Sequence, residues 1–208
     1  MASLLTTAQH RQLWNAFRDG DQAAFAQLYD LFAADLYRYG YNLVRNRPLV
    51  EDCLHELFLH LHDNHQRLGP TDNIRFYLFR ALRRRLLDTV GRLNKLDSAD
   101  YLFDNAQFMI PPYEATLVAE ELIDHQKRIL IDELNKLPKR QKEILYLVYM
   151  KELSYQQAAE VMGITLKSVY NTVNVALTAL RAMIQQALQL KGALVGLTSL
   201  LAGYFANN

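Results

Sequence analysis

The sequence has a single cysteine, Cys53, among 208 residues. One thiol excludes an internal disulfide and a zinc site built from four cysteines. Scarce cysteine is typical of proteins that work in a reducing compartment, so we expect a cytoplasmic location with Cys53 as a small buried side chain. The N-terminal residues also lack the basic segment and apolar core of a signal peptide.

Long apolar runs are missing as well. No stretch of 18 apolar residues occurs, so the sequence predicts no membrane-spanning helix. The nearest candidate, Gly192–Ala206, is short and interrupted by glycines. Glycine occurs only eight times and proline five times, which is too few for a chain rich in turns and hairpins and favours helices over strands.

The chain as a whole has no large excess of either charge, since it contains 23 basic and 22 acidic residues and its net charge is +1. The charges are nevertheless segregated. Arg75–Lys95 has seven bases and one acid, Tyr101–Glu133 has seven acids and two bases, and Lys136–Lys142 has four bases and no acid. Because these blocks cancel, the net charge says nothing about an anionic partner.

Apolar residues recur at three- and four-residue steps along most of the chain, which is the pattern of amphipathic helices. We expect a short helix around Leu13–Phe17, a long one capped by Asp21, a third with Pro48 in its first turn and a fourth capped by Asp72. No segment alternates like a strand. The sequence therefore predicts an all-α fold with two helical domains joined by a linker.

The periodicity stops from about Lys95 to Tyr113, where aspartate, asparagine, serine and proline dominate. We interpret this stretch as an acidic linker, and helical spacing resumes near Glu114. The expected boundaries are a first domain at 1–95, a linker at 96–113, a second domain at 114–190 and an apolar extension at 191–208.

A helix-turn-helix pattern occurs in the second domain, although any helical hairpin would share part of it. Ala159 lies in the first helix, Gly163 follows four residues later in the turn, and Val169 follows six residues after that. The small side chain lets the helices approach, the glycine can adopt the left-handed conformation that ends a helix, and the valine packs the second helix on the first. Ser154 begins a capping-box sequence, and Thr165 is the expected cap of the second helix.

Leu166–Leu180 would then be the recognition helix. Polar side chains at its start can bond phosphates or base edges, and asparagine suits adenine. Only one of them is charged, so we expect modest attraction to phosphates. The residues expected to be exposed there are Lys167, Ser168, Tyr170, Asn171, Thr172 and Asn174.

The segment Arg75–Lys95 combines a basic stripe with Phe76, Tyr77 and Phe79. Cations follow a phosphate backbone, and exposed rings stack on the bases of single strands. The other interpretation is a solvated charged face. For Phe79, which shares a helical face with Leu82 and Leu86, we expect burial in the core.

Four histidines, His55, His60, His62 and His65, lie close together in the sequence. The spacing HELFLH is one residue longer than the zinc-protease motif, so its two histidines do not share a helix face. We therefore expect no metal site and no cofactor. No nucleophile–base arrangement, phosphate loop or carboxylate pair stands out, so we expect that the protein is not an enzyme.

Three segments in this order resemble the extracytoplasmic-function (ECF) sigma factors of bacterial RNA polymerase, of the sigma-70 superfamily. The resemblance covers about residues 20–185. The first two segments are similar to sigma region 2 and the third to sigma region 4: FAQLYDLFAADLYRYGYNLVRNRPLVEDCLHELFLHLHD, IRFYLFRALRRRLLDTVGR and LPKRQKEILYLVYMKELSYQQAAEVMGITLKSVYNTVNVALTALR.

The resemblance implies a sigma factor that directs core polymerase to promoters and assists their opening. It implies bacterial RNA polymerase core, promoter DNA and an anti-sigma factor as partners, with no small-molecule substrate, and a compact free form that cannot bind DNA. Core-polymerase binding is implied for Asp52, His55 and Glu56. Minus-ten contacts are implied for Leu68, Asn73, Arg75, Tyr77, Arg80, Arg83, Arg84 and Arg85, and the loop from Leu68 to Asn73 would capture a flipped base.

Minus-thirty-five contacts are implied for Lys139, Arg140, Lys167, Ser168, Tyr170, Asn171 and Asn174. The linker at 98–112 would thread toward the RNA exit path. Many family members have tryptophan in place of Tyr77 and asparagine in place of Arg84, so this chain departs from the pattern there. Two other functions fit the sequence: a helix-turn-helix regulator that acts without polymerase, and a sigma-like protein that acts only through protein contacts.

Overall fold

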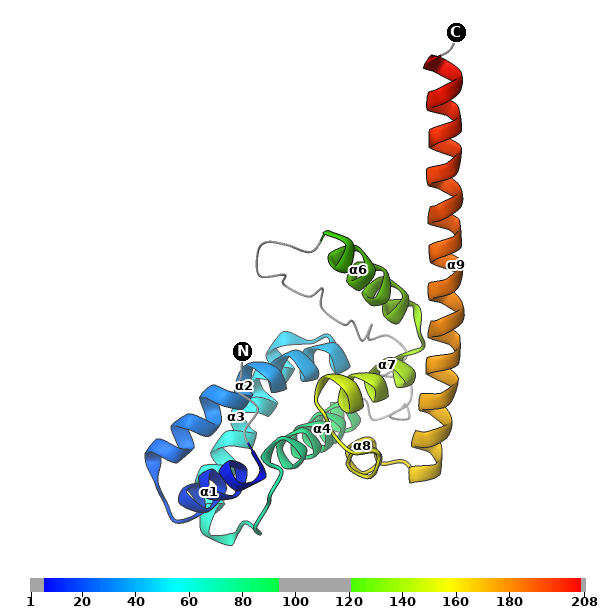
Figure 1. Ribbon diagram of the computed structural model, residues 1–208. Helices are drawn as coiled ribbons and strands as arrows, with labels where there is room; N and C mark the ends of the chain where they lie inside the picture. Colours follow the sequence, from blue (N-terminus) through cyan, green and yellow to red (C-terminus); the bar gives the residue numbers. More distant parts are fainter. Residues whose placement is uncertain (1–5, 94–120, 207–208) are drawn as a thin grey trace.

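The computed structural model describes residues 6–93 and 121–206, with side chains placed over 6–92 and 129–187. Over these ranges the regular structure is helical and no strand occurs (Figure 1), which confirms the all-α prediction. No helix in the same part of the chain is long and apolar enough to cross a membrane. The expected linker at 96–113 and the helix start expected at Glu114 lie outside the described residues.

Within residues 6–93 the first domain has four α-helices and a 3-10 turn. Asp21 caps the second helix by accepting hydrogen bonds from the amides of Ala23 and Ala24, and Pro48 lies in the first turn of the third, as expected. The elements are α1 (Thr7–Arg18), α2 (Gln22–Val44), α3 (Arg47–Asn64), η1 (His65–Arg67) and α4 (Ile74–Leu93).

The predicted cap of α4 at Asp72 is wrong. The side chain of Asn73 accepts the hydrogen bond from the Phe76 amide, at 2.9 Å. α4 begins one residue later than the Asp72 cap requires, and Asn73 is as good a capping residue as aspartate. This cap matters for the site because it fixes the start of the basic helix next to the preceding loop.

The core of the first domain lies between α2, α3 and α4, with α1 packed across one end. Phe79, Leu82 and Leu86 on α4 are fully buried, as expected from their shared face. Gly40 on α2 allows the close approach of these helices, because a β-carbon there would lie 2.9 Å from Val50 and 3.2 Å from Leu86. Cys53 is buried in the same core, as predicted.

The described part of the second domain contains five helical elements, and α7 continues directly into a π-helical turn, η2. Together α7 and η2 form one continuous helical stretch from Lys139 to Met150, with a change of pitch at Tyr146. The elements are α6 (Glu121–Lys136), α7 (Lys139–Leu145), η2 (Tyr146–Met150), α8 (Tyr155–Met162) and α9 (Leu166–Ala206).

The helix-turn-helix pattern is confirmed in α8 and α9. Ser154 and Gln157 form the reciprocal capping box that the sequence predicts. Gly163 ends α8 in the left-handed conformation, with a φ of 67°. Val169 is fully buried, and Thr165 accepts a hydrogen bond from the Ser168 amide. Each local feature therefore has the role that its residue type suggested.

The last helix is longer than expected. We expected the second domain to end at residue 190 and a separate apolar extension to follow, but α9 continues as one helix to Ala206 and extends away from the other helices (Figure 1). The alanines and leucines after Lys191 favour a helix, and an isolated glycine costs only about 1 kcal/mol relative to alanine. The side chains of the expected apolar face after residue 191 lie outside the described part.

The two domains pack on each other through α4 and α8 (Figure 1). α4 carries the basic stripe, and α8 is the first helix of the helix-turn-helix. The contact therefore places two of the predicted DNA-binding elements against each other.

Candidate nucleic-acid interface

A groove between α3 and α4 carries much of the basic stripe. Arg84 projects into solvent with 85% of its side chain exposed, and Arg85 forms an ion pair with Glu56 of α3 at 2.7 Å. The guanidinium of Arg80 lies 6.0 Å from the ring centre of Phe76. The groove is lined by both charged and aromatic residues, including His60, Phe76, Tyr77, Arg80, Arg84, Arg85 and Arg92. Such a surface can hold phosphates and stack bases.

The loop before α4 is held in place by α1. The indole of Trp14 donates a hydrogen bond to the carbonyl of Gly69 at 2.9 Å, and Arg18 donates one to the carbonyl of Leu68 at 2.7 Å. The Trp14 ring also packs on Tyr77, with ring centres 5.0 Å apart. Burial against this cluster raises the pKa of the Tyr77 hydroxyl. The loop expected at Leu68–Asn73 is therefore a fixed element next to the groove.

Arg83 has a different position from the other arginines of α4. Its Nε donates to Oε1 of Glu143 on α7 at 2.9 Å, and the hydroxyl of Tyr39 donates to the same oxygen at 2.7 Å. Only 10% of the Arg83 side chain and 4% of the Glu143 side chain are exposed. In this arrangement Arg83 joins the two domains and does not face solvent.

The pKa values within this cluster follow from burial and from the carboxylate. Burial alone would lower the pKa of Arg83, but the adjacent Glu143 outweighs it and the pKa is raised. For Tyr39, burial and the Glu143 carboxylate act in the same direction and raise the pKa of the phenol far above its ordinary value. Arg83 therefore stays charged and Tyr39 stays protonated, so both remain hydrogen-bond donors to Glu143.

A second ion pair joins the domains on the side of α2. Lys151, after η2, contacts Asp35 at 2.8 Å, and both side chains are largely buried. Burial raises the pKa of Asp35, but Lys151 and Arg38 outweigh it and the pKa is lowered. At Lys151 burial prevails over the single carboxylate, so its pKa is also lowered.

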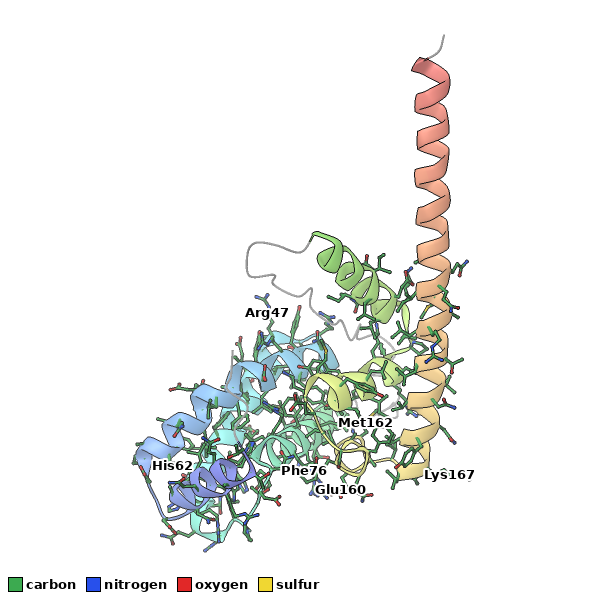
Figure 2. All side chains as sticks on the ribbon, in the orientation of Figure 1. Arg47, His62, Phe76, Glu160, Met162 and Lys167 are labelled. Atoms are coloured by element: carbon green, nitrogen blue, oxygen red, sulfur yellow. The ribbon has the colours of Figure 1, made fainter. Side chains whose placement is uncertain are left out.

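Polar contacts at the edge of α4 complete the junction. Arg80 pairs with Glu160 of α8 at 3.1 Å, and Glu160 and Phe76 lie where α4 meets α8 (Figure 2). Arg75 donates to the carbonyl of Lys151 at 3.4 Å, and Asn73 donates to Gln157 at the same distance. These contacts occupy part of the basic helix with groups of the second domain.

The recognition helix remains exposed in this arrangement. Lys167, at its start, lies on the outer side of α9 away from the first domain (Figure 2), and Tyr170, Asn171 and Asn174 are also exposed. The hydroxyl of Ser168 instead lies 2.8 Å from that of Thr165 in the helix cap. The other two residues predicted for the minus-thirty-five element lie at the start of α7 and not on the recognition helix. Arg140 is exposed there and Lys139 is half-buried.

The three residues predicted for core-polymerase binding share the solvent side of α3. Asp52, His55 and Glu56 are all exposed. His55 also lines a groove between α2 and α3, together with Tyr29, Asp30, Ala33, Ala34, Tyr37, Arg38, Glu51, Leu54 and Phe58. Tyr29 is 49% exposed there, so the groove offers both apolar and charged contacts.

Three of the four histidines on α3 and η1 contact nearby polar groups. His60 contacts Asn64, His62 contacts Asp63, and His65 contacts the carbonyl of Arg18. No group of three metal-ligating side chains occurs among the residues whose side chains are placed.

Sequence reasoning missed the residues that connect the domains and anchor the loop. Asp35, Tyr39, Glu143 and Glu160 lie far along the chain from their partners. Tyr39 and Glu143, for example, are 104 positions apart. The one available signal was their residue type, because a tyrosine or a carboxylate on an otherwise apolar helix face needs a polar partner.

Comparison with known families gives two matches on this chain. Residues 28–95 match the family model for Sigma-70 region 2, and residues 127–180 match that for Sigma-70, region 4. The first covers α2 to α4 and the second covers α6 to the recognition helix. The linker region between them is matched by neither.

Curated relatives extend over most of the chain. The ECF RNA polymerase sigma factor SigM of Bacillus subtilis (strain 168) is 28% identical over 149 residues, covering 67% of this chain and 82% of the relative. SigW of the same strain is 23% identical, and the match covers 81% of this chain and 92% of that relative. EcfG of Rhodopseudomonas palustris (strain TIE-1) is 28% identical, and the match covers 74% of this chain and 83% of that relative.

Two solved structures share the fold. One is CnrH in complex with the cytosolic domain of CnrY, with a TM-score of 0.52 and 20% identity over 85% of this chain and 97% of that one. The other is the sigma factor RpoE in complex with the anti-sigma factor NepR from Bartonella quintana. Its TM-score is 0.51, and the two chains are 18% identical over 77% of this chain and 96% of that one.

Proposed function

The chain belongs to the sigma-70 family of RNA polymerase sigma factors, and from this membership we propose that it directs core polymerase to promoters and helps to open them. Sigma factors in general are not enzymes; here the work would come from binding energy that favours opened DNA over closed DNA. The observation that carries the proposal is the groove of α3 and α4, where arginines and aromatic rings line one surface.

The groove suits the opened strand of the minus-ten element. Arg84 and Arg85 supply cations for a phosphate backbone, and Phe76 supplies a ring for stacking. The loop from Leu68 to Asn73, which Trp14 and Arg18 hold next to this groove, would receive the flipped base. Unstacking a base costs a few kcal/mol, which a rigid pocket beside cations can offset.

The exposed side of α3 is the proposed contact with core polymerase. Asp52, His55 and Glu56 lie there beside the groove of α2 and α3, where Tyr29 adds apolar surface. An apolar centre with a charged rim is the usual composition of a protein interface.

The packed arrangement fits a resting form of the free protein. Arg83 and Arg80 are paired with Glu143 and Glu160 of the second domain, in place of the phosphates that they would bind on an open promoter. The domains must therefore separate before the whole of α4 can meet DNA. A further partner is proposed by analogy, because both solved relatives are complexes and RpoE is bound to an anti-sigma factor. We also propose a cytoplasmic location.

Reconstitution tests the proposal. Purified chain is mixed with bacterial core polymerase, the complex is isolated by gel filtration, and run-off transcription is measured on genomic promoter fragments. We expect a stoichiometric complex and transcription that depends on the chain. Strong duplex binding without polymerase, combined with no complex, would instead favour a helix-turn-helix regulator.

A matched set of variants separates the roles. Replacement of Arg84 and Arg85 by alanine should abolish promoter opening and leave core binding intact. Replacement of Asp52 and His55, which lie outside the α3–α4 groove, should weaken core binding and leave folding intact. If the arginine variant opened promoters normally, the chain would act only through protein contacts.

A further inference from the structure

The end of α2 holds two cations over one aromatic ring. The guanidinium groups of Arg45 and Arg47 lie 5.1 Å and 5.7 Å from the ring centre of Tyr41, and Tyr37 stacks on the same ring. Arg45 is the C-cap of α2 in the left-handed conformation, with a φ of 52°. Figure 2 shows Arg47 where α2 turns into α3. Because residues other than glycine adopt this conformation only when their surroundings enforce it, the charge of Arg45 has a fixed place in the fold.

Three more bases lie at the start of α7. Lys139 and Arg140 begin this helix, and Lys142 is 5% exposed. The Lys142 amine donates to the carbonyl of Asn135 at 3.1 Å. Burial lowers the pKa of this amine, and the neighbouring Arg45 and Lys139 lower it further. Arg45, from the first domain, is therefore close enough to act on a cation of the second domain.

We call these five bases the cationic seam: Arg45, Arg47, Lys139, Arg140 and Lys142. Their stretches of sequence supply no acid, because neither 41–50 nor 134–142 contains an aspartate or a glutamate. The next carboxylate, Glu143, already accepts two hydrogen bonds. Elsewhere the two domains meet through opposite charges, as Lys151 and Asp35 do. Like charges that meet at a junction repel each other, so an anionic segment at the seam stabilises the packed form.

The linker of the chain has the charge and the reach to be that segment. α4 ends at Leu93, and the chain resumes with α6 at Glu121, which leads into α7. The 27 residues between them contain five acids and one base. Fully extended, a chain of this length spans about 90 Å. A tethered segment also has an effective concentration of about 1 mM at its site, which favours it over an anion free in solution.

We propose that the acidic linker, through Asp97, Asp100 and Asp104, binds the cationic seam and holds the two domains together in the free protein. The proposal rests on the proposed function, because it identifies what stabilises the resting form. A partner that draws the linker away leaves like charges of the two domains next to each other and thereby favours their separation. The linker then controls access to the basic helix as well as connecting the domains.

Crosslinking of the full, free chain tests the contact directly. A carbodiimide joins a carboxylate to an amine with loss of water and adds no spacer, so it reports side chains in contact. We expect monomers in which one of the three linker aspartates is joined to Lys139, identified by mass spectrometry. If Lys139 is not joined to the linker, the inference is overturned. Crosslinks confined to dimers would assign the seam to a second copy of the chain and overturn it as well.

A variant that keeps both reacting groups tests whether the seam attracts the linker. Arg47→Gln combined with Arg140→Gln removes two exposed charges of the seam and should lower the yield of the Lys139 crosslink several-fold. Arg67→Gln, an exposed change on η1, is the control and should leave the yield unchanged. Equal yields from the double variant and the control would contradict the proposal.

Neutralising the linker should release the domains. Asn in place of Asp97, Asp100 and Asp104 should increase the radius of gyration by small-angle scattering. The same variant should bind a single-stranded DNA probe about tenfold more tightly, the combined value of three modest ion pairs. The control carries Asp19→Asn, Asp63→Asn and Asp132→Asn, which remove the same charge from exposed positions outside the linker.

The outcomes separate this inference from the proposed function. If the linker variant matches the control in dimensions and DNA affinity, the inference is overturned, while transcription with core polymerase still supports the function. Packing that requires inorganic phosphate in the buffer and not the linker aspartates would assign the seam to a free anion and also overturn the inference. Failure of the wild-type chain to bind core polymerase would overturn the function and leave the crosslinking result standing.

Discussion

Arg83 on α4 and Glu143 on α7 form an ion pair, 2.9 Å between Nε and Oε1, that joins the two domains. The hydroxyl of Tyr39 donates to the same carboxylate oxygen. An arginine in this position cannot also contact a phosphate of the promoter. The pair therefore links the packing of the domains to the availability of the basic helix.

Glu143→Gln should weaken the packed arrangement. Removing one charge of a buried pair leaves the other uncompensated, which costs about 3–5 kcal/mol when the surroundings do not relax. Separation of the domains relieves this cost, so we expect a larger radius of gyration by small-angle scattering and tighter binding of a single-stranded DNA probe. Glu160→Gln is the matched control, because its pair with Arg80 is exposed and worth about 0–1 kcal/mol. Unchanged dimensions and unchanged DNA affinity in Glu143→Gln would show that the pair does not hold the domains together.

Gly40→Ala should destabilise the first domain by overpacking. The added β-carbon would lie 2.9 Å from Val50 and 3.2 Å from Leu86 in a filled core. We expect a loss of about 1–3 kcal/mol in the free energy of unfolding, measured with urea. Gly91→Ala on α4 is the control, because nothing lies within 4 Å of its new β-carbon and alanine favours a helix by about 0.5–1 kcal/mol. Equal stability of the two variants would contradict this account of the core.

Local features were predictable from the sequence because each depends on neighbouring residues. The capping box at Ser154, the left-handed Gly163 and the buried Val169 all follow from residue type and spacing. The cap at Asn73 was assigned to Asp72 because adjacent residues with the same capping ability cannot be separated by pattern. The end of α9 was misplaced for a related reason, since glycines weaken a helix without ending it.

Contacts between distant residues were not predictable in the same way. The family resemblance implied a promoter contact for Arg83 together with the other arginines of α4, although Arg83 lies four residues after Phe79 and three before Leu86 and so shares their buried helix face. Its carboxylate partner, Glu143, lies 60 positions away, and the sequence pattern of α7 does not indicate that this side chain points toward α4. The hydrogen bond by which Trp14 anchors the loop was equally hard to predict. A tryptophan on an apolar helix face is expected in the core, and the sequence does not indicate which carbonyl its N–H will contact.

Trp14→Phe should loosen the loop before α4. The change removes the donor to the Gly69 carbonyl and part of a fully buried ring. We expect a loss of about 1–3 kcal/mol in stability and weaker promoter opening, seen as reduced permanganate reactivity of unpaired thymines. Gln12→Ala, an exposed change on the same helix, should alter neither. If the Trp14→Phe protein were folded and opened promoters normally, the anchored loop would not be needed to capture the flipped base.

Acid should destabilise the protein in two steps that belong to two different groups. Burial and the nearby Arg75 lower the pKa of His10 from 6.5, and Asp72 only partly opposes them. As the pH falls through about 6.5, the unfolded chain binds a proton that the folded chain does not, so the free energy of unfolding decreases.

The second step comes from Asp35. Lys151 and Arg38 outweigh burial and lower its pKa from 3.8, so its contribution to stability is present above about pH 4 and is lost as the pH falls through the lowered pKa. Urea unfolding at a series of pH values measures both steps. His10→Gln should lose part of the first step and keep the second, whereas Asp35→Asn should lower stability at neutral pH and flatten the second. A pH profile identical to wild type in the His10→Gln protein would assign the first step to other histidines.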